Sequence, residues 1–293
     1  LQWVWAIQPN KYSKPFIAIW PRGTGKSTDA ELSSIMVGAR ETRKYLLYIS
    51  GIQDQADKHV ESIAAKLESK AIENAYPALG SPQIGKYGNV KGWRRNRLTT
   101  ASGFTIEAFG LDTGIRGIKI EDYRPDLFIF DDIDSSKDSM EIIDKKIRIL
   151  THDILPARAP HATVLAGQNL IHGNSIFSRL ADGRADFLAD RIVSGPHKAL
   201  DNMEWEYRDG KAIIVSGTPT WAHKDIAACQ QEVTTSGIKS FLVECQQEVE
   251  LAGNPRFTLD AIKIAKEQIQ HPLPQSALPE QFHNIKGLSV WAL

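Results

Sequence analysis

The sequence predicts an α/β protein with a mostly parallel sheet flanked by helices, and with a small C-terminal lid subdomain. Two observations support this prediction. Short apolar segments at residues 16–19, 45–50, 127–130 and 162–167 have the length of buried strands. Segments with helical spacing of apolar residues lie between them, and this alternation favours parallel strands joined by right-handed crossovers.

Length and composition place the chain among soluble globular proteins. Its 293 residues allow one large domain or two, and 42% hydrophobic with 24% charged residues is an ordinary balance. No apolar segment approaches the length of a membrane span. The net charge is zero, so any contact with nucleic acid must come from local patches. Cys229 and Cys245 are too few for a disulfide framework or a zinc site, and they suit a reducing cytosol.

The first strand, residues 16–19, runs into a glycine-rich loop and then a helix that begins at Lys26. This context makes a phosphate-binding loop (Walker A) a usable prediction, because the backbone N–H groups and the helix N-terminus favour bound phosphate. We expect Lys26 to reach the β- and γ-phosphates of ATP and Ser27 to bind Mg²⁺. The loop is a variant, with Trp20 where the pattern has its first glycine. The predicted nucleotide-binding residues are Pro21, Arg22, Gly23, Thr24, Gly25, Lys26, Ser27 and Thr28.

The strand at residues 127–130 ends in three acids, Asp131, Asp132 and Asp134. Carboxylates at the carboxyl end of a parallel strand lie where open α/β sheets bind ligands. Three neighbouring acids repel one another without a cation, so a metal is the economical explanation. Joined to the upstream loop, they predict a P-loop NTPase of the ASCE (RecA-like) class that uses ATP and Mg²⁺.

Two further positions are candidates with open alternatives. Gln8 lies near Trp3 and Trp5 ahead of the first strand, where it could bind an adenine edge; alternatively, the segment packs its indoles on the core. Gln168 and Asn169 follow the strand at 162–167. They could sense the γ-phosphate or hold the attacking water, or they could cap the following turn.

The densest basic cluster, residues 91–97, contains Arg94, Arg95 and Arg97 beside an aromatic residue. Such a cluster suits a nucleic-acid backbone or a flipped base, and a solvated strand edge is an equally good interpretation. Residues 97–110 predict two strands that turn at Ser102 and Gly103. The glycine-rich loop that follows carries Arg116.

Four segments, residues 21–28, 115–117, 124–132 and 240–247, together resemble the large terminase subunit of tailed bacteriophages. That protein is the motor ATPase that packages viral DNA. The likeness spans roughly residues 16–250, with the motifs in the order of the family.

The resemblance implies roles for several residues. Arg22 would lie against the γ-phosphate, as a cis-acting arginine or as a switch that couples hydrolysis to movement. Arg116 is a candidate finger for the nucleotide of a neighbouring subunit. Gln168 falls where the family has its coupling motif, with an amide in place of the more usual Thr or Ser.

The acids receive roles in the same way. Asp131 would hold Mg²⁺ through water or through the Ser27 hydroxyl, and Asp132 would polarise the attacking water. Many family members have Asp-Glu at these two positions, so Asp132 is one methylene shorter than usual. Asp134 is the reserve candidate for the catalytic carboxylate.

The resemblance also implies partners and organisation. Double-stranded DNA, a portal protein and a small terminase subunit are the expected partners, in a ring, expected to be a pentamer, that forms from monomers at the procapsid portal vertex in the bacterial cytoplasm. The expected divisions are an ATPase core at residues 1–220, a lid at 221–255 and a linker at 256–293. The linker would lead toward a nuclease domain, so this chain is not expected to cut DNA.

Two other functions share many of these features. A different nucleic-acid translocase or helicase-like ATPase would use the same loop and acids, but a helicase needs a second RecA-like lobe, for which 293 residues leave no room. A non-hydrolysing nucleotide switch in an assembly is the other alternative. Intact Lys26, Ser27, Asp131 and Asp132 argue against it.

Overall fold

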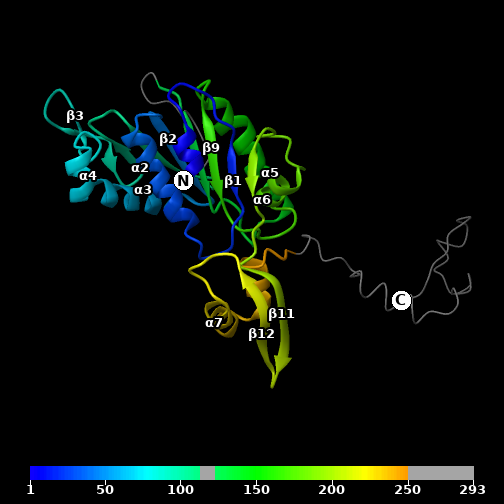
Figure 1. Ribbon diagram of the computed structural model, residues 1–293. Helices are drawn as coiled ribbons and strands as arrows, with labels where there is room; N and C mark the ends of the chain where they lie inside the picture. The colour runs from blue at the N-terminus through cyan, green and yellow to red at the C-terminus, as the bar shows by residue number, and fades with distance from the viewer. Residues whose placement is uncertain (113–122, 250–293) are drawn as a thin grey trace, which may run out of the picture. The chain divides into compact units, whose positions relative to one another are not determined.

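The computed structural model describes residues 1–112 and 123–249 (Figure 1). By its contacts the chain divides into two units, Leu1–Glu250 and Leu251–Leu293, and the described residues belong to the first. Within the described ranges, no helix has both the length and the apolar character needed to cross a membrane.

An eight-stranded sheet forms the centre of the first unit, with the strand order β10-β1-β9-β8-β2-β7-β6-β5. Six neighbouring strands from β10 to β7 are parallel, and β6 and β5 continue the sheet as an antiparallel edge. In sheet order these strands are Ile192–Ser194, Phe16–Ala18, Thr163–Gly167, Leu127–Asp131, Tyr45–Ser50, Thr105–Gly110, Arg97–Thr99 and Trp93–Arg94. The predicted α/β class with a mostly parallel sheet is confirmed.

The strand order brings the predicted site together. The phosphate-loop strand β1 and the acidic strand β8 both pair with β9, which lies between them. Because β1, β9 and β8 are parallel, the residues that follow each of them meet at one edge of the sheet. We call this the carboxyl edge.

Helices cover both faces of the sheet (Figure 1). One face packs against α1 (Gln2–Ala6), α2 (Lys26–Ala39) and α3 (Gln53–Leu67), with α4 (Lys70–Ala75) beside α3. The other face packs against α5 (Met140–Arg148) and α6 (Ile176–Asp182), and α5 runs on through a π-helical segment at Ile149–Ile154 and a short 3₁₀ turn at Leu155–Ala157.

Alternation along β8 divides the core between the two faces. Phe128 and Phe130 pack with the α5–α6 layer, whereas Leu127 and Ile129 pack with the α2–α3 layer. Successive side chains of a strand point to opposite faces, so Asp131 continues the second set and points toward α2 and α3. This is why the carboxylate meets residues from those helices.

The small subdomain contains a hairpin that the sequence interpretation did not anticipate. β11 (Leu200–Arg208) pairs with β12 (Lys211–Pro219) in a separate two-stranded sheet. Its buried residues join α7 (Ile226–Ser236) and α8 (Ile238–Glu244) in a third hydrophobic cluster. The hairpin therefore packs with the helices predicted for the lid, upstream of residue 221. The predicted divisions at 220 and 255 stay predictions, and the linker at 256–293 lies outside the described residues.

The region near the antiparallel edge follows the sequence prediction. Residues 76–92 form a largely exposed excursion that contains a short antiparallel pair, β3 (Gln83–Ile84) and β4 (Val90–Lys91). The chain then turns between β6 and β7 at Gly103, whose φ is 83°. Positive φ favours glycine, so the predicted turn at Ser102 and Gly103 is confirmed.

Candidate active site

The glycine loop connects β1 to the N-terminus of α2. Gly23 and Gly25 have φ values of 82° and 80°, and Gly25 is the N-cap of the helix. Any side chain there would strain the backbone. Thr24 Oγ1 donates to the Pro21 carbonyl at 2.8 Å, which closes the turn. The loop thus places the N-terminus of α2, a 14-residue helix, at the carboxyl edge. A helix N-terminus favours a bound anion.

Trp20 and Lys26 hold the ends of this loop in place. The Trp20 indole N–H donates to Ser194 Oγ at 3.0 Å, which ties the start of the loop to β10. Lys26 Nζ donates to the carbonyls of Trp20 at 3.1 Å and Pro21 at 2.9 Å. Burial lowers the pKa of the Lys26 amine, opposed by the charges of Asp132 and Asp131. An aromatic residue in place of the first glycine therefore anchors the loop.

Ser27 and Asp131 meet at the carboxyl edge, as the sequence predicts. Ser27 Oγ donates to Asp131 Oδ1 at 3.1 Å, and the Tyr48 hydroxyl donates to the other oxygen at 2.7 Å. Asp131 is only 1% exposed, and burial raises its pKa, opposed by the hydrogen bond from Tyr48. A hydroxyl and a carboxylate beside a phosphate loop fit Mg²⁺, which takes few protein ligands and completes its octahedron with water and phosphate oxygens. Within the described residues, no group of three or more His, Cys, Asp or Glu side chains forms a metal site by itself.

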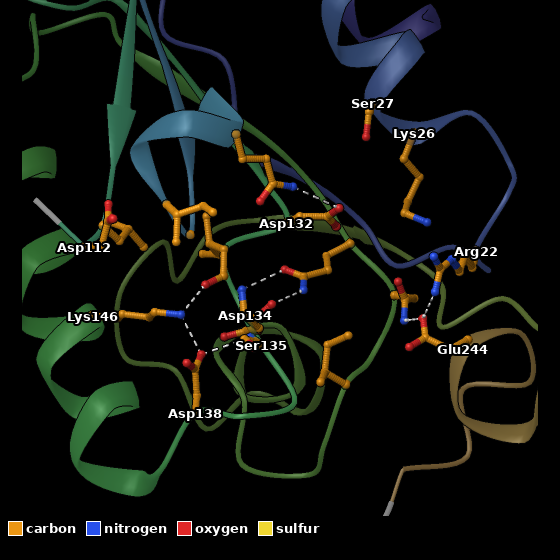
Figure 2. A pocket seen from close by; sticks show the side chains of 18 of the residues that line it. Arg22, Lys26, Ser27, Asp112, Asp132, Asp134, Ser135, Asp138, Lys146 and Glu244 are labelled. Carbon is orange, nitrogen blue, oxygen red and sulfur yellow. Dashed lines mark hydrogen bonds and ion pairs between the residues drawn. The ribbon is translucent and has the colours of Figure 1, made fainter. Parts of the chain in front are cut away.

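Asp132 lines a cavity of about 840 Å³ together with Lys26 and Ser27. Its backbone has a φ of 49°, and its carbonyl accepts from Gly51 N at 3.1 Å. Its carboxylate has one long contact, 3.5 Å from Gln55 Nε2. Figure 2 shows the side chain extending toward Lys26. Asp132 is thus an acid that lines the cavity, and its carboxylate is available to a ligand or a water.

Asp134 is different, because it caps a helix. Its two carboxylate oxygens accept from Ile176 N at 3.0 Å and Phe177 N at 2.8 Å, in the first turn of α6. The residue is 6% exposed, and burial raises its pKa against these backbone hydrogen bonds. Both oxygens bind the helix, which argues against the reserve catalytic role of Asp134.

Two side chains, Gln168 and Lys146, hold the segment at residues 133–138 that follows β8. Gln168 is 1% exposed; its Oε1 accepts from Asp134 N at 3.0 Å, and its Nε2 donates to the Asp134 carbonyl at 2.8 Å. Lys146 Nζ lies 2.7 Å from the Ile133 carbonyl and 2.5 Å from Asp138 Oδ2 (Figure 2). This arrangement favours the turn-capping interpretation of Gln168, since its amide joins the end of β9 to the segment after β8.

Arg22 faces the end of α8. Its guanidinium Nη1 lies 3.8 Å from Glu244 Oε2, and its backbone N–H donates to the Glu244 carbonyl at 2.9 Å. Asn169 Nδ2 donates to the same carboxylate at 3.0 Å. Glu244 was missed as a site residue, although it lies within the motif at 240–247. The structure makes it the junction between the phosphate loop, the end of β9 and the small subdomain.

The structure separates Gln8 from the loop. Arg43 Nη1 donates to the Gln8 carbonyl at 3.0 Å, and Arg43 lies just before β2. The beginnings of the parallel strands lie at the edge of the sheet opposite the phosphate loop. This placement favours the alternative in which the segment packs on the core, and the adenine contact of Gln8 stays a prediction. Arg116 lies outside the described residues.

The basic cluster does not form one surface. Arg95, in the turn between β5 and β6, has its Nη2 2.6 Å from Asp54 Oδ1 and its Nε 3.8 Å from Glu61. Arg94 and Arg97 are cross-strand partners and line a separate cavity of about 610 Å³. Of the three predicted nucleic-acid contacts, Arg95 is thus already paired with acids.

No family model matches the chain, and no curated protein matches it. The ATPase domain of the large terminase of Thermus phage P74-26 is similar to it, with 15% sequence identity and a TM-score of 0.36. The alignment covers 57% of this chain and 64% of that domain, so this chain matches less than two thirds of it.

Proposed function

We propose that this protein is a Mg²⁺-dependent P-loop ATPase. The observation that supports this most directly is the 3.1 Å contact between Ser27 and Asp131, two residues that are 104 positions apart in the chain. They meet beside a glycine loop at a helix N-terminus, and Ser27 lines a cavity together with Lys26 and Asp132. A phosphate cradle, a hydroxyl–carboxylate pair and an accessible second acid are the parts that phosphoryl transfer to water requires.

In this proposal water attacks the γ-phosphate in line with the leaving group. Asp132 orients and polarises that water, because its carboxylate faces the cavity. Lys26 and Arg22 oppose the charge that develops on the phosphoryl oxygens. When bound by Ser27 and Asp131, Mg²⁺ would add positive charge beside the β- and γ-phosphates.

Movement would follow from the contacts of the small subdomain with the loop. Glu244 joins Arg22 to Asn169, and the Leu170 N–H donates to Gln247 Oε1 at 2.7 Å. Release of phosphate would change the contacts of Arg22 and relax the segment near Gln168. The subdomain built on α7 and α8 would then move relative to the sheet.

The finer proposal is a motor that packages viral DNA. Its support is the ordered set of terminase-like motifs in the sequence. The substrate would be double-stranded DNA gripped by its backbone, without sequence readout. The partners would be a portal protein, a small terminase subunit and further copies of this chain in a ring at the procapsid portal. In that ring Arg116 would serve the nucleotide of the neighbouring copy, and an isolated chain would turn over slowly.

Steady-state ATP hydrolysis by Lys26→Ala and Asp132→Asn variants tests the proposal. We expect both to lose turnover, with nucleotide binding lost in the first and kept in the second. Asp144→Asn is a matched control, because Asp144 is an exposed acid of α5 that contacts Arg179 outside the cavity. Wild-type turnover in either test variant would make the role of that residue wrong.

Two further measurements separate the alternatives. Tight ATP binding without phosphate release, even in an assembled ring with DNA, would identify a non-hydrolysing switch. ATP-driven strand displacement would identify a helicase-like translocase in place of a packaging motor.

A further inference from the structure

A chain of buried and half-buried side chains holds the carboxylate oxygen of Asp131 that does not face Ser27. The Tyr48 hydroxyl of β2 donates to Oδ2 at 2.7 Å, and Nε2 of His59, from α3, lies 3.5 Å from the same oxygen. The two rings stack with centroids 4.9 Å apart and an interplanar angle of 24°. Oδ2 is therefore occupied by the support, and Oδ1 is turned to Ser27.

The chain of contacts continues into α2. His59 Nδ1 lies 2.8 Å from Glu31 Oε1, and Glu31 Oε2 lies 2.8 Å from Ser62 Oγ and 2.5 Å from Lys66 Nζ. Glu31 is 7% exposed. It lies one turn beyond Ser27 on the helix that begins at the phosphate loop. The contacts thus connect the loop helix, α3 and the end of β8.

Packing alone does not account for this choice of residues. Burying charged groups is costly, and a well-packed apolar set in such a position is often as stable or more stable. The contacts lead to the one carboxylate that meets the hydroxyl of the phosphate loop. In metal sites, partners behind the ligands fix their orientation and raise the affinity for the metal.

We propose that His59, held by Glu31, is a positioning residue that keeps Asp131 Oδ1 directed toward Ser27 and the Mg²⁺ of a bound nucleotide. This inference rests on the proposed ATPase function. His59 acts through Asp131 and does not itself line the cavity that contains Lys26 and Asp132. Sequence analysis did not find it, because nothing in the spacing of Glu31, Tyr48 and His59 marks a shared site.

The other end of β8 offers a matched control. His161 Nε2 lies 3.6 Å from Oδ2 of Asp126, which directly precedes the strand. This pair also joins a histidine to a buried aspartate, but at the edge of the sheet opposite the phosphate loop. Replacement of His161 removes a comparable contact without touching the predicted nucleotide site.

The test measures binding of a fluorescent ADP analogue while Mg²⁺ is varied, and again in EDTA. In His59→Phe, which keeps an aromatic ring against Tyr48, we expect the Mg²⁺ concentration for half-maximal effect to rise about 10- to 100-fold. Binding in EDTA should stay unchanged. His59→Gln should stay close to wild type, since its amide nitrogen can take the place of Nε2. His161→Phe should leave the Mg²⁺ requirement unchanged.

Several outcomes would overturn the positioning role of His59. A folded His59→Phe protein with the wild-type Mg²⁺ requirement overturns the inference, and so does an equal shift in His161→Phe. If His59→Phe does not fold, Glu31→Gln replaces it: a raised Mg²⁺ requirement supports the inference and an unchanged one overturns it. A wild-type protein whose nucleotide binding ignores Mg²⁺ would overturn the proposed function as well, whereas a Mg²⁺-dependent wild type with unaffected variants overturns the inference alone.

Discussion

The two ends of β8 each carry a buried aspartate, and the two are held in different ways. At the beginning of the strand, Asp126 accepts from the backbone N–H groups of Tyr45 at 2.9 Å and Lys44 at 2.8 Å. At its end, Asp131 accepts from the hydroxyls of Ser27 and Tyr48. Burial raises the pKa of both carboxyl groups. Burial and pKa therefore do not distinguish a structural acid from a candidate ligand.

The donors do distinguish them. Backbone N–H groups are fixed by the sheet, so the carboxylate they bind is committed to the fold. A hydroxyl can rotate and can itself bind a cation through its oxygen, so the Ser27–Asp131 pair remains open to a ligand. Asp134 follows the structural pattern although it lies only three residues from Asp131, because two N–H groups of α6 bind it.

The largest expected effect is a difference in kcat between variants of the acids at the two ends of β8. Asp132→Asn should lower kcat for ATP roughly 10²- to 10³-fold, as loss of one group that acts on the transition state does. Asp126→Asn should leave kcat unchanged and lower the free energy of unfolding by about 1–3 kcal/mol, because an amide cannot accept both N–H groups. Steady-state kinetics and urea unfolding measure the two quantities. Loss of kcat in Asp126→Asn would show that the two edges are not functionally separate.

The next largest effect is a difference in the free energy of unfolding between variants of Asp134 and Asp132. Asp134→Ala should lower the free energy of unfolding by roughly 2–4 kcal/mol, because two buried N–H groups of α6 lose their acceptor. Asp132→Ala should change stability much less, because within the described residues the hydrogen bond given for its carboxylate is a long one, 3.5 Å from Gln55. Urea unfolding of the two variants checks the difference. Equal destabilisation would contradict the assignment of Asp134 to the helix cap.

A smaller effect is expected from pH at the support behind Asp131. Burial alone would raise the pKa of Glu31, but hydrogen bonds from His59, Lys66 and Ser62 outweigh it and lower the pKa from 4.5 to about 2. A lowered pKa means that the ionised form stabilises the folded state. That contribution is complete above the ordinary pKa and is lost as the pH falls from 4.5 toward 2.

The stability difference between wild type and Glu31→Gln should therefore be largest near neutral pH and should shrink as the pH falls below 4.5. Urea unfolding at several pH values measures it. Glu61→Gln is the control, because Glu61 is an exposed acid of α3, the helix that carries His59, with a 3.8 Å contact to Arg95. A difference that stays constant down to acidic pH would show that Glu31 does not contribute through its charge.

The smallest effect concerns DNA at the antiparallel end of the sheet. Arg94→Ala should lower the slope of DNA affinity against salt by about 1, as loss of one phosphate contact does. Arg95→Ala should lower it less, because its guanidinium is paired with Asp54 and Glu61. DNA-binding titrations over a range of salt concentrations measure the slope. The reverse order would place the DNA contact on the turn and not on the paired strands.

Much of the fold could be predicted, because it depends on local patterns. Apolar segments marked β1, β2, β8 and β9, and helical spacing marked α2, α3 and α5. β10 was missed because its three residues carry no periodic signal, and it is a strand only because it pairs with β1. β11 was missed although the sequence carries a strand signal there. Met203, Trp205 and Tyr207 alternate with polar residues, as in a half-buried strand.

The candidate site shows the same division. The sequence could predict Lys26, Ser27 and Asp131. Each lies at the end of a strand or in the first turn of a helix, and parallel strands bring such positions together. For Gln8 the sequence left two alternatives, and strand direction favours core packing, since a residue that precedes a parallel strand lies toward the opposite edge. The different states of Asp132 and Asp134 depend on α6, which returns to this edge from more than forty residues downstream.

By itself the sequence determined the class of the fold, the phosphate loop and the acids at the end of a buried strand, because these depend on residue type, spacing and strand length. Tertiary structure decided which acid stays open to a ligand, what Arg22 faces and which side chains stand behind Asp131. Those outcomes depend on contacts between residues far apart in the chain. A hydrogen-bond donor from a distant helix leaves no mark in the local sequence, yet it determines whether a carboxylate serves the fold or the site.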